Sequence, residues 1–335
     1  MSSAKPTAKT TAKTLRFSSA SCLLVLATMI FPSSGFGAFV FQDDGQALTI
    51  LENDAPVLVY RYGMVEPPER VDAKFRRACY IHPLYGLDGE VLTQDFPFDH
   101  RHHRGVFWAW PKSTVGGRAA DVWALEGIRQ VHEAFVERRA DAAEAVIAVR
   151  NGWVYDDEPG KAVVREHVRF VVHPVGENTR AIDFELTFEN ASGEEVVISG
   201  SSAEDKGVTK GYGGFCLRPD ATRSPMRFTA VNGVEKEDAL SLETPWCDVS
   251  FPVERKDDKL SGVAIFQHPR NPGYPHPGWI LRHYGFLGVS WPHTVDHPLA
   301  PGASVTLRYR MWIHRGDADA AGIPAAFAAY TSAAP

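Results

Sequence analysis

Cysteine is scarce in this sequence, with four in 335 residues. Cys22 lies in an amino-terminal apolar stretch, which leaves Cys79, Cys216 and Cys247, an odd number with no paired spacing. Such a set does not indicate a disulfide scaffold or a cysteine-based zinc site. One disulfide plus a free thiol stays open, and the sequence does not say which two cysteines would pair.

The sequence also has no excess of positive charge and, after residue 37, no long apolar run. The formal net charge is −6, so we expect no nucleic-acid partner. No later segment approaches the roughly 20 uninterrupted apolar residues of a transmembrane helix. We therefore expect no membrane-spanning segment in the mature chain.

Residues 1–37 have the order of a secretory signal peptide. A basic end without acidic residues precedes an apolar run from Ala20 to Phe31, and small residues follow at Gly35 and Gly37. We expect cleavage near the Gly37–Ala38 bond, and an uncleaved membrane anchor is the alternative. Either interpretation predicts export, and hence a periplasmic or extracellular protein.

Alternation of apolar and polar residues with a period of two is the clearest structural pattern. Apolar side chains occupy every second position of residues 181–189, which predicts a half-buried antiparallel strand. Residues 164–172 have the same pattern, and the turn residues at 174–178 predict that the two segments form a hairpin. Another strand is predicted at 304–314.

Shorter strands are predicted along most of the chain, at 39–42, 48–52, 57–62, 131–138, 143–149, 196–199 and 263–267. Helical spacing occurs at 317–330, with Asp317 or Asp319 as the cap. The fold class is therefore all-β. We expect one large antiparallel β-sandwich domain over residues 38–315, then a short C-terminal helix and tail over residues 316–335.

Polar chemistry is concentrated in residues 99–104, where three histidines, two arginines and one carboxylate follow one another. Such groups are costly to bury without partners, so this run is expected at a cleft. One interpretation is a divalent transition-metal site with His100, His102 and His103 as ligands, helped by a distant histidine.

A second interpretation is acid–base catalysis. His100 and His103 are then the proton-transfer candidates, Asp99 orients an imidazole, and Arg101 or Arg104 holds the substrate. Flat faces for sugar rings would come from three tryptophans, Trp108, Trp110 and Trp123. A third interpretation is structural: residues 107–110 form a buried strand, and the charged run is a hydrogen-bonded loop that braces it.

Further candidates lie elsewhere in the chain. Lys206 and Tyr212 flank glycines that allow close backbone approach to a ligand. Arg282 and His283 lie beside an aromatic segment, although a lone histidine is more often structural. We take Lys206, Tyr212 and Arg282 as substrate-binding candidates and His283 as a further catalytic candidate.

Several motifs together resemble the PmoA-like family of secreted bacterial proteins. They are the segments 80–85, 99–105, 212–214, 268–269 and 282–285. The resemblance implies an association with carbohydrate metabolism and a β-rich fold similar to the large sandwich of aldose epimerases. It does not imply methane oxidation, because the chain has none of the membrane helices of such a subunit.

These observations predict an exported carbohydrate-active protein, acting as a lyase, hydrolase or epimerase through histidine and arginine acid–base chemistry. Its ligand would be a small molecule or an oligosaccharide. The alternatives are a histidine-ligated copper, zinc or iron protein, and a non-catalytic sugar-binding protein.

Overall fold

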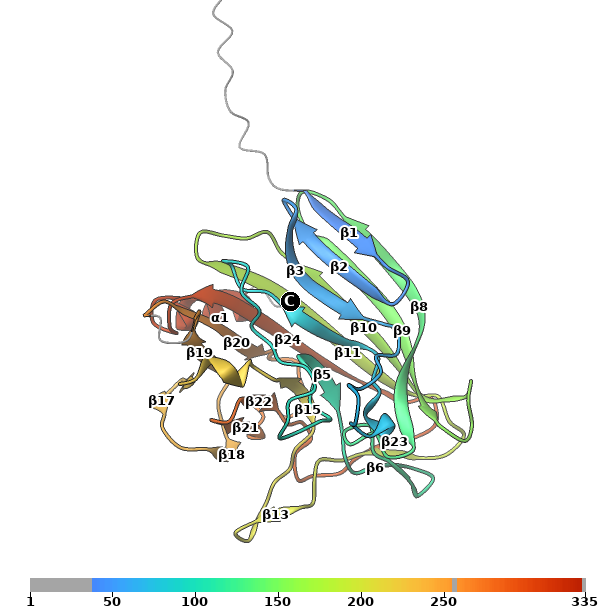
Figure 1. The fold of residues 1–335 in the computed structure, drawn as a ribbon. Coiled ribbons are helices and arrows are strands. Elements are labelled where there is room, and N and C mark those ends of the chain that lie inside the picture. The colour runs from blue at the N-terminus through green and yellow to red at the C-terminus, as the bar shows by residue number, and fades with distance from the viewer. Residues whose placement is uncertain (1–37, 255–257, 333–335) are drawn as a thin grey trace, which may run out of the picture. The chain divides into compact units, whose positions relative to one another are not determined.

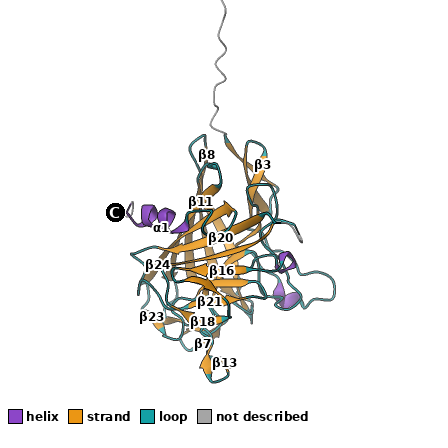
Figure 2. Ribbon diagram, turned by 90° about the vertical axis from the view of Figure 1, so that its left-hand side faces the viewer, coloured by secondary structure: helices purple, strands orange, loops and turns teal. Residues whose placement is uncertain are grey.

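A computed structural model describes residues 38–254 and 258–332 (Figure 1). The predicted signal peptide at 1–37 lies outside these residues. Strands dominate, with one short α-helix near the C-terminus (Figure 2). No helix in the described ranges is both long and apolar enough to cross a membrane.

Two nine-stranded sheets carry most of the chain, and all their paired strands are antiparallel. The first contains, in spatial order, β1 (Phe39–Asp43), β2 (Ala47–Glu52), β3 (Ala55–Arg61), β4 (Tyr80–Leu84), β5 (Val106–Ala109), β15 (Gly214–Leu217), β22 (Phe286–Val289), β21 (Trp279–Arg282) and β18 (Ala239–Leu242). The second contains β17 (Gly233–Glu235), β16 (Arg227–Ala230), β19 (Trp246–Pro252), β20 (Leu260–Gln267), β24 (Ser304–Arg315), β11 (Thr179–Asn190), β10 (Ala162–Val172), β9 (Ala145–Tyr155) and β8 (Ile128–Ala140).

Smaller elements complete the fold. They are a four-stranded sheet of β23 (His297–Leu299), β12 (Val196–Ile198), β6 (Ser113–Val115) and β7 (Arg118–Ala120), a hairpin of β13 (Glu204–Asp205) and β14 (Val208–Thr209), the 3-10 turns η1 (Ala73–Phe75) and η2 (Ala221–Arg223), and the helix α1 (Ile323–Ser332). The β13–β14 hairpin projects beyond the neighbouring strands in both views (Figures 1 and 2).

The core lies between the two large sheets, which confirms the predicted sandwich. Alternate residues of β11 point into it, and Phe184 of this strand packs against Phe215 of β15 with ring centroids 5.1 Å apart. Phe215 in turn stacks on Tyr309 of β24 at 4.7 Å. Apolar side chains of both sheets are therefore removed from water in one continuous cluster.

The strongest local patterns are also confirmed. Strands β10 and β11 pair in register from Val164–Asn190 to Val172–Ile182, as the predicted hairpin requires. The last long strand is β24, one residue longer than predicted at its end. The predicted buried strand at 107–110 corresponds to β5, which begins and ends one residue earlier, at Val106 and Ala109, and lies between β4 and β15.

The C-terminal helix begins later than predicted, at Ile323 rather than Asp317. Asp317 forms a separate turn: its carboxylate Oδ1 accepts from Ala320 N at 3.1 Å, and its carbonyl accepts from Ala321 N at 2.9 Å. Gly322 then adopts a left-handed φ of 61°, and Pro324 lies in the first turn of the helix. Proline is well tolerated there because it needs no backbone donor, so the helix begins after the glycine.

The possible disulfide is not formed. Cys79, Cys216 and Cys247 are all buried and free. Burial raises the pKa of each thiol well above its ordinary value, so these cysteines behave as small core residues.

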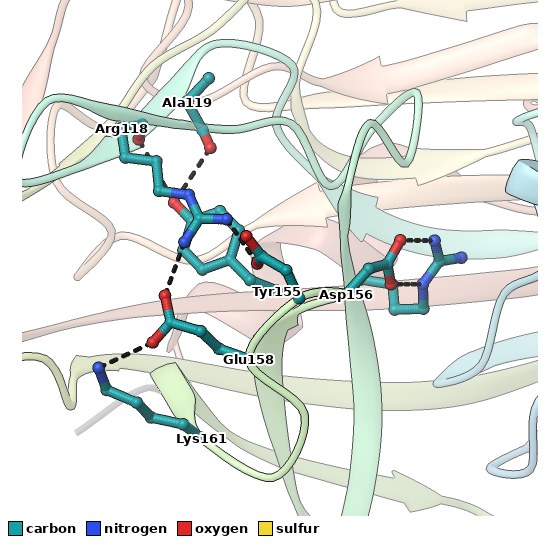
Figure 3. Close-up of polar contacts among 8 residues, drawn as sticks. Arg118, Ala119, Tyr155, Asp156, Glu158 and Lys161 are labelled. Atoms are coloured by element: carbon teal, nitrogen blue, oxygen red, sulfur yellow. Dashed lines mark hydrogen bonds and ion pairs between the residues drawn. The ribbon is translucent and has the colours of Figure 1, made fainter.

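A surface network ties β7 to the turn that follows β9 (Figure 3). Arg118 donates to Glu158 at 2.7 Å and covers the ring of Tyr155, whose hydroxyl donates to the carbonyl of Ala119. Glu158 also accepts from Lys161 at 3.0 Å. These contacts hold the small sheet, and the loops that leave it, against the second large sheet.

Candidate functional site

A cleft of about 460 Å³ lies on the face of the first sheet that points away from the second. Phe107 of β5 and Phe286 of β22 pack beneath it, against His103 and Trp123. Strands β5, β15, β22 and β21 are direct neighbours, so loops distant in sequence meet there (Figure 1). The lining residues are His100, His102, His103, Pro111, Trp123, Ser201, Ala203, Asp205, Lys210, Tyr212, Arg282 and Tyr284.

His100 and Asp99 form a hydrogen-bonded pair at the edge of this cleft. His100 Nδ1 lies 2.8 Å from Asp99 Oδ2. Because Nδ1 is engaged, Nε2 is the nitrogen of His100 that is left for a ligand. The structure thus brings together the two residues that the sequence analysis assigned to proton transfer and to its orientation.

Arg218 holds the other oxygen of Asp99. Its Nη2 donates to Asp99 Oδ1 at 2.8 Å, and its side chain is only 1% exposed. Burial disfavours the ionised form of Asp99, but hydrogen bonds from His100 and Arg218 outweigh it, so the pKa of Asp99 is lowered. The sequence analysis missed Arg218, because no motif surrounds it.

The His100 ring is fixed from both sides. It stacks on His103 at 4.7 Å and on Tyr284 at 4.8 Å, with planes within 13° of parallel. The turn of the loop adds a backbone hydrogen bond from His103 N to the carbonyl of His100. The imidazole is therefore positioned before a ligand arrives.

His102 and His103 are held neutral. Burial, followed by the nearby Arg77 and His100, lowers the pKa of His102 to about 3. Burial and the adjacent His102 lower the pKa of His103 well below its ordinary value. The Nδ1 atom of His103 is buried without a hydrogen-bond partner among the described residues. Both rings can accept or donate hydrogen bonds, but neither carries a charge near neutral pH.

The arrangement does not fit the predicted metal site of His100, His102 and His103. His102 and His103 meet edge to face at 4.6 Å, while His100 and His103 lie face to face. The nitrogen lone pairs of the stacked His100 and His103 lie in nearly parallel planes and do not converge on one point. In the described ranges no group of three or more histidine, cysteine, aspartate or glutamate side chains could hold a metal ion.

Arg282 forms the opposite wall of the cleft and is held by acidic and phenolic side chains. Arg282 Nε donates to the Tyr212 hydroxyl at 2.8 Å, and its Nη atoms lie 3.4 Å from Asp238 and 3.6 Å from Asp205. Burial disfavours the charged guanidinium, but Tyr212 and Asp238 outweigh it and the pKa of Arg282 is raised. Burial and Tyr212 also raise the pKa of Tyr284. The Tyr284 phenol therefore stays a protonated donor.

Two of the three predicted tryptophan platforms are wrong. Trp108 lies on β5, which has strands on both sides, and Trp110 directly follows β5 and packs edge-on against Phe188; both are 0% exposed. Trp108 Nε1 donates to buried Glu166 at 2.9 Å, and Trp110 Nε1 donates to the carbonyl of Trp291 at 2.7 Å. Neither can touch a ligand. Trp123, 7% exposed, does line the cleft.

The two arginines of the histidine-rich loop also lie outside the cleft lining. Arg104 is fully buried and donates to the carbonyls of Arg101 and His103, so the structure contradicts its predicted role as a substrate clamp. Arg101 donates to the carbonyl of Phe96 at 2.8 Å. These guanidiniums brace the loop, as the structural interpretation proposed, because the turn leaves several carbonyls without strand partners.

Two further candidates lie outside the cleft lining. Lys206 occupies the turn of the β13–β14 hairpin with a φ of 52°, and Lys210 lines the cleft instead. His283 points at Asp238, with Nδ1 at 2.9 Å from Oδ1, and packs edge-on against Phe228. Its neighbours Arg282 and Tyr284 face the cleft because adjacent residues of this turn alternate in direction.

The fold and the cleft together define an all-β sandwich protein with a carboxylate-oriented histidine in an aromatic cleft. The chain belongs to a family of unknown function, DUF6807, whose model matches residues 47–328. The match confirms membership of an uncharacterised family, and its description carries no PmoA label.

Searches of known proteins add a few remote likenesses. No curated protein matches this sequence. Among solved structures, an α-galactosidase from Lactobacillus brevis superposes with a TM-score of 0.42 at 10% identity over 84% of this chain and 39% of its own. Heparan sulfate lyase HepC from Pedobacter heparinus gives a TM-score of 0.33, with 8% identity over 84% and 36%. A Klebsiella pneumoniae protein described as an aldose 1-epimerase candidate gives 0.35, with 10% identity over 89% of both chains. The chain thus spans about two fifths of the first two proteins.

Proposed function

We propose that this protein is an exported enzyme that acts on a sugar by acid–base chemistry in the cleft, as a lyase, hydrolase or epimerase. The observation that carries the proposal is the chain of contacts from Arg218 through Asp99 to His100, which ends at a cleft-lining imidazole. A histidine oriented by a carboxylate through Nδ1 is a standard arrangement for a general acid or base.

Each group has a defined part in such chemistry. Ionised Asp99, with its lowered pKa, fixes the His100 tautomer with the proton on Nδ1. Nε2 then accepts a proton from a substrate hydroxyl or carbon acid, and Asp99 stabilises the resulting imidazolium. Arg218 is a positioning residue, since it touches Asp99 and lies behind it.

The lining suits a hydroxyl-rich ring. Trp123, Tyr212 and Tyr284 offer aromatic surface for the C–H face of a sugar. Donors on Lys210 and Arg282 and acceptors on Asp205 can meet hydroxyl groups of either polarity. A cavity of about 460 Å³ fits a small molecule or the end of an oligosaccharide.

We propose export because residues 1–37 have the order of a signal peptide. Expression of the full chain in a bacterial host, followed by fractionation and N-terminal sequencing, tests it. A periplasmic product that begins near Ala38 supports export. A product that keeps the leader in the cytoplasm contradicts it.

The catalytic part is tested with the purified protein on a panel of mono-, di- and polysaccharides, with products followed by chromatography and NMR. We expect His100→Ala and Asp99→Asn to lower turnover by about a hundredfold or more. His167→Ala is the matched control, because this exposed histidine pairs with Glu189 at 3.2 Å on the second sheet. Equal turnover in wild type and His100→Ala would overturn the assignment. Saturable sugar binding without turnover would make the protein a sugar-binding protein instead.

A further inference from the structure

A second cleft, of about 420 Å³, lies on the outer face of the second sheet and shares no residue with the candidate active site. We call it the arginine cleft. Its basic lining consists of Arg169 of β10, Arg308 and Arg310 of β24, and Arg270 of the loop after β20. Tyr330 of α1 closes one side.

Strand alternation places these charges together. Along β11, Phe184 points into the core, whereas Asp183 and Glu185 point outward. The register sets Asp183 opposite Arg310, and Glu185 opposite both Arg308 on one side and Arg169 on the other. The outer face therefore carries a cross-strand array of guanidiniums around two carboxylates.

Donors in this array exceed the acceptors. Arg310 forms a bidentate interaction with Asp183, through Nε at 2.6 Å and Nη2 at 2.7 Å. Arg308 uses only Nε, on Glu185 at 2.8 Å. Within the described residues, no hydrogen bond or ion pair engages the guanidinium of Arg270 or the Nη atoms of Arg308. Arg169 lies 3.7 Å from Glu137 of β8. Four arginines therefore face three carboxylates, and the cleft keeps a net positive charge.

His268 and Tyr330 add neutral polar groups to the same wall. The Arg270 amide donates to His268 Nδ1 at 3.1 Å, so the proton of the neutral ring is on Nε2. Burial, followed by the charges of Arg270 and Arg308, lowers the pKa of His268 and keeps that ring neutral. Tyr330 lies under the Arg310 guanidinium, 4.5 Å from ring centroid to Cζ, and is 8% exposed. His268, Tyr330 and the paired Arg310 thus form a packed wall, and the exposed Arg270 lies beside it.

We propose that the arginine cleft binds an oxyanion group, namely a sulfate, a phosphate or the carboxylate of an acidic sugar. Guanidinium forks match the geometry of such groups and are weakly hydrated, so they bind them well at a partly enclosed surface. The protein as a whole is negatively charged, so long-range steering does not favour anions and the local donors must supply the affinity. This site is independent of the proposed catalysis.

The test is isothermal titration of the full-length mature protein with sodium sulfate, sodium phosphate and sodium glucuronate, at ionic strength held constant with sodium chloride. We expect saturable binding of at least one of them at one site per chain. Arg270→Gln and Arg308→Gln should each weaken it about tenfold or more, since each removes a charged donor. Binding confined to sulfate or phosphate identifies an inorganic ion, and tighter binding of glucuronate identifies an acidic sugar.

Arg165→Gln is the matched control, because Arg165 lies on the same strand and outward face as Arg169 but outside the cleft. It should bind the anion as wild type does, and so should His100→Ala, which separates this site from the candidate active site. The proposal is overturned if none of the three anions binds saturably, or if both cleft variants bind as tightly as Arg165→Gln.

Discussion

Arg218 and Asp99 lie 2.8 Å apart, Nη2 to Oδ1, although 119 residues separate them in the chain. Pairing of β5 with β15 brings them together, since Val106 lies opposite Leu217 and Arg218 N donates to the carbonyl of Gly105. Arg218, which directly follows β15, therefore positions Asp99, and the pairing of β5 with β15 sets the distance between them.

Replacement of Arg218 by methionine should damage both stability and the site. We expect Arg218→Met to lower the free energy of unfolding by roughly 1.5–3 kcal/mol, the usual size of a charged hydrogen bond, and to raise the pKa of Asp99 toward its ordinary value. Urea denaturation measures the first effect, and an NMR titration of the carboxyl measures the second. Arg165→Met, at an exposed position, should change neither. An unchanged pKa of Asp99 would show that Arg218 does not hold it.

Glu166 is a buried acid of the core that accepts hydrogen bonds from four side chains. It is 0% exposed and accepts hydrogen bonds from Trp108, Gln130, Asn151 and Trp153 at 2.6 to 3.3 Å. Burial raises its pKa despite these donors. We expect Glu166→Leu to cost more than about 3 kcal/mol, because several buried donors lose their only acceptor.

Glu166→Gln is the paired variant, since it keeps the shape and one acceptor oxygen. It should cost clearly less than Glu166→Leu in denaturant unfolding. If the two variants are equally unstable, hydrogen bonding to Glu166 is not what the core requires at this position.

His314 and Asp248 form a buried pair that should make stability depend on pH. His314 Nε2 lies 2.7 Å from Asp248 Oδ1, and both side chains are 0% exposed. Burial disfavours the charged imidazole, but Asp248 outweighs it and the pKa of His314 is raised above 6.5. The folded protein therefore holds a proton that the unfolded chain releases above about pH 6.5. The stabilisation is fully present below that pH and is lost as the pH rises through the folded-state pKa.

Chemical denaturation between pH 6 and pH 9 checks this prediction. The free energy of unfolding of the wild type should fall over that window, relative to that of Asp248→Asn, in which the raised pKa is removed. Parallel curves for the two proteins would mean that His314 does not titrate in the range.

Gly105 lies where the histidine-rich loop enters β5, and it has no room for a side chain. An added Cβ would lie 2.2 Å from the carbonyl oxygen of Ile81, which is backbone and cannot move aside. We expect Gly105→Ala to lower the thermal midpoint and to cost about 1–3 kcal/mol. Gly193→Ala is the control, because nothing lies within 4 Å of its Cβ and its φ is not left-handed. Equal melting of both variants would contradict the close approach.

The sequence by itself determined the fold class, the β10–β11 hairpin, the last long strand and the segment that carries the candidate catalytic pair. Period-two alternation is a local property, and the charged run that contains Asp99 and His100 is visible in the sequence. The hydrogen bond between these two side chains, in contrast, depends on the turn of the loop and on Arg218. The start of the C-terminal helix was less well predicted. It lies at Ile323 because Asp317 forms a separate turn and Gly322 has a left-handed φ.

Only the tertiary structure decided which side chains reach the cleft. Trp108 and Trp123 are alike in sequence terms, yet strand pairing covers Trp108 on β5 and leaves Trp123 at the cleft. Arg104 and Arg282 look equally suited to bind a substrate, but only the carbonyls and acids brought to them by distant segments show that the first braces a loop and the second lines a wall. Exposure and long-range partners depend on which strands become neighbours, and that information is not contained in local spacing.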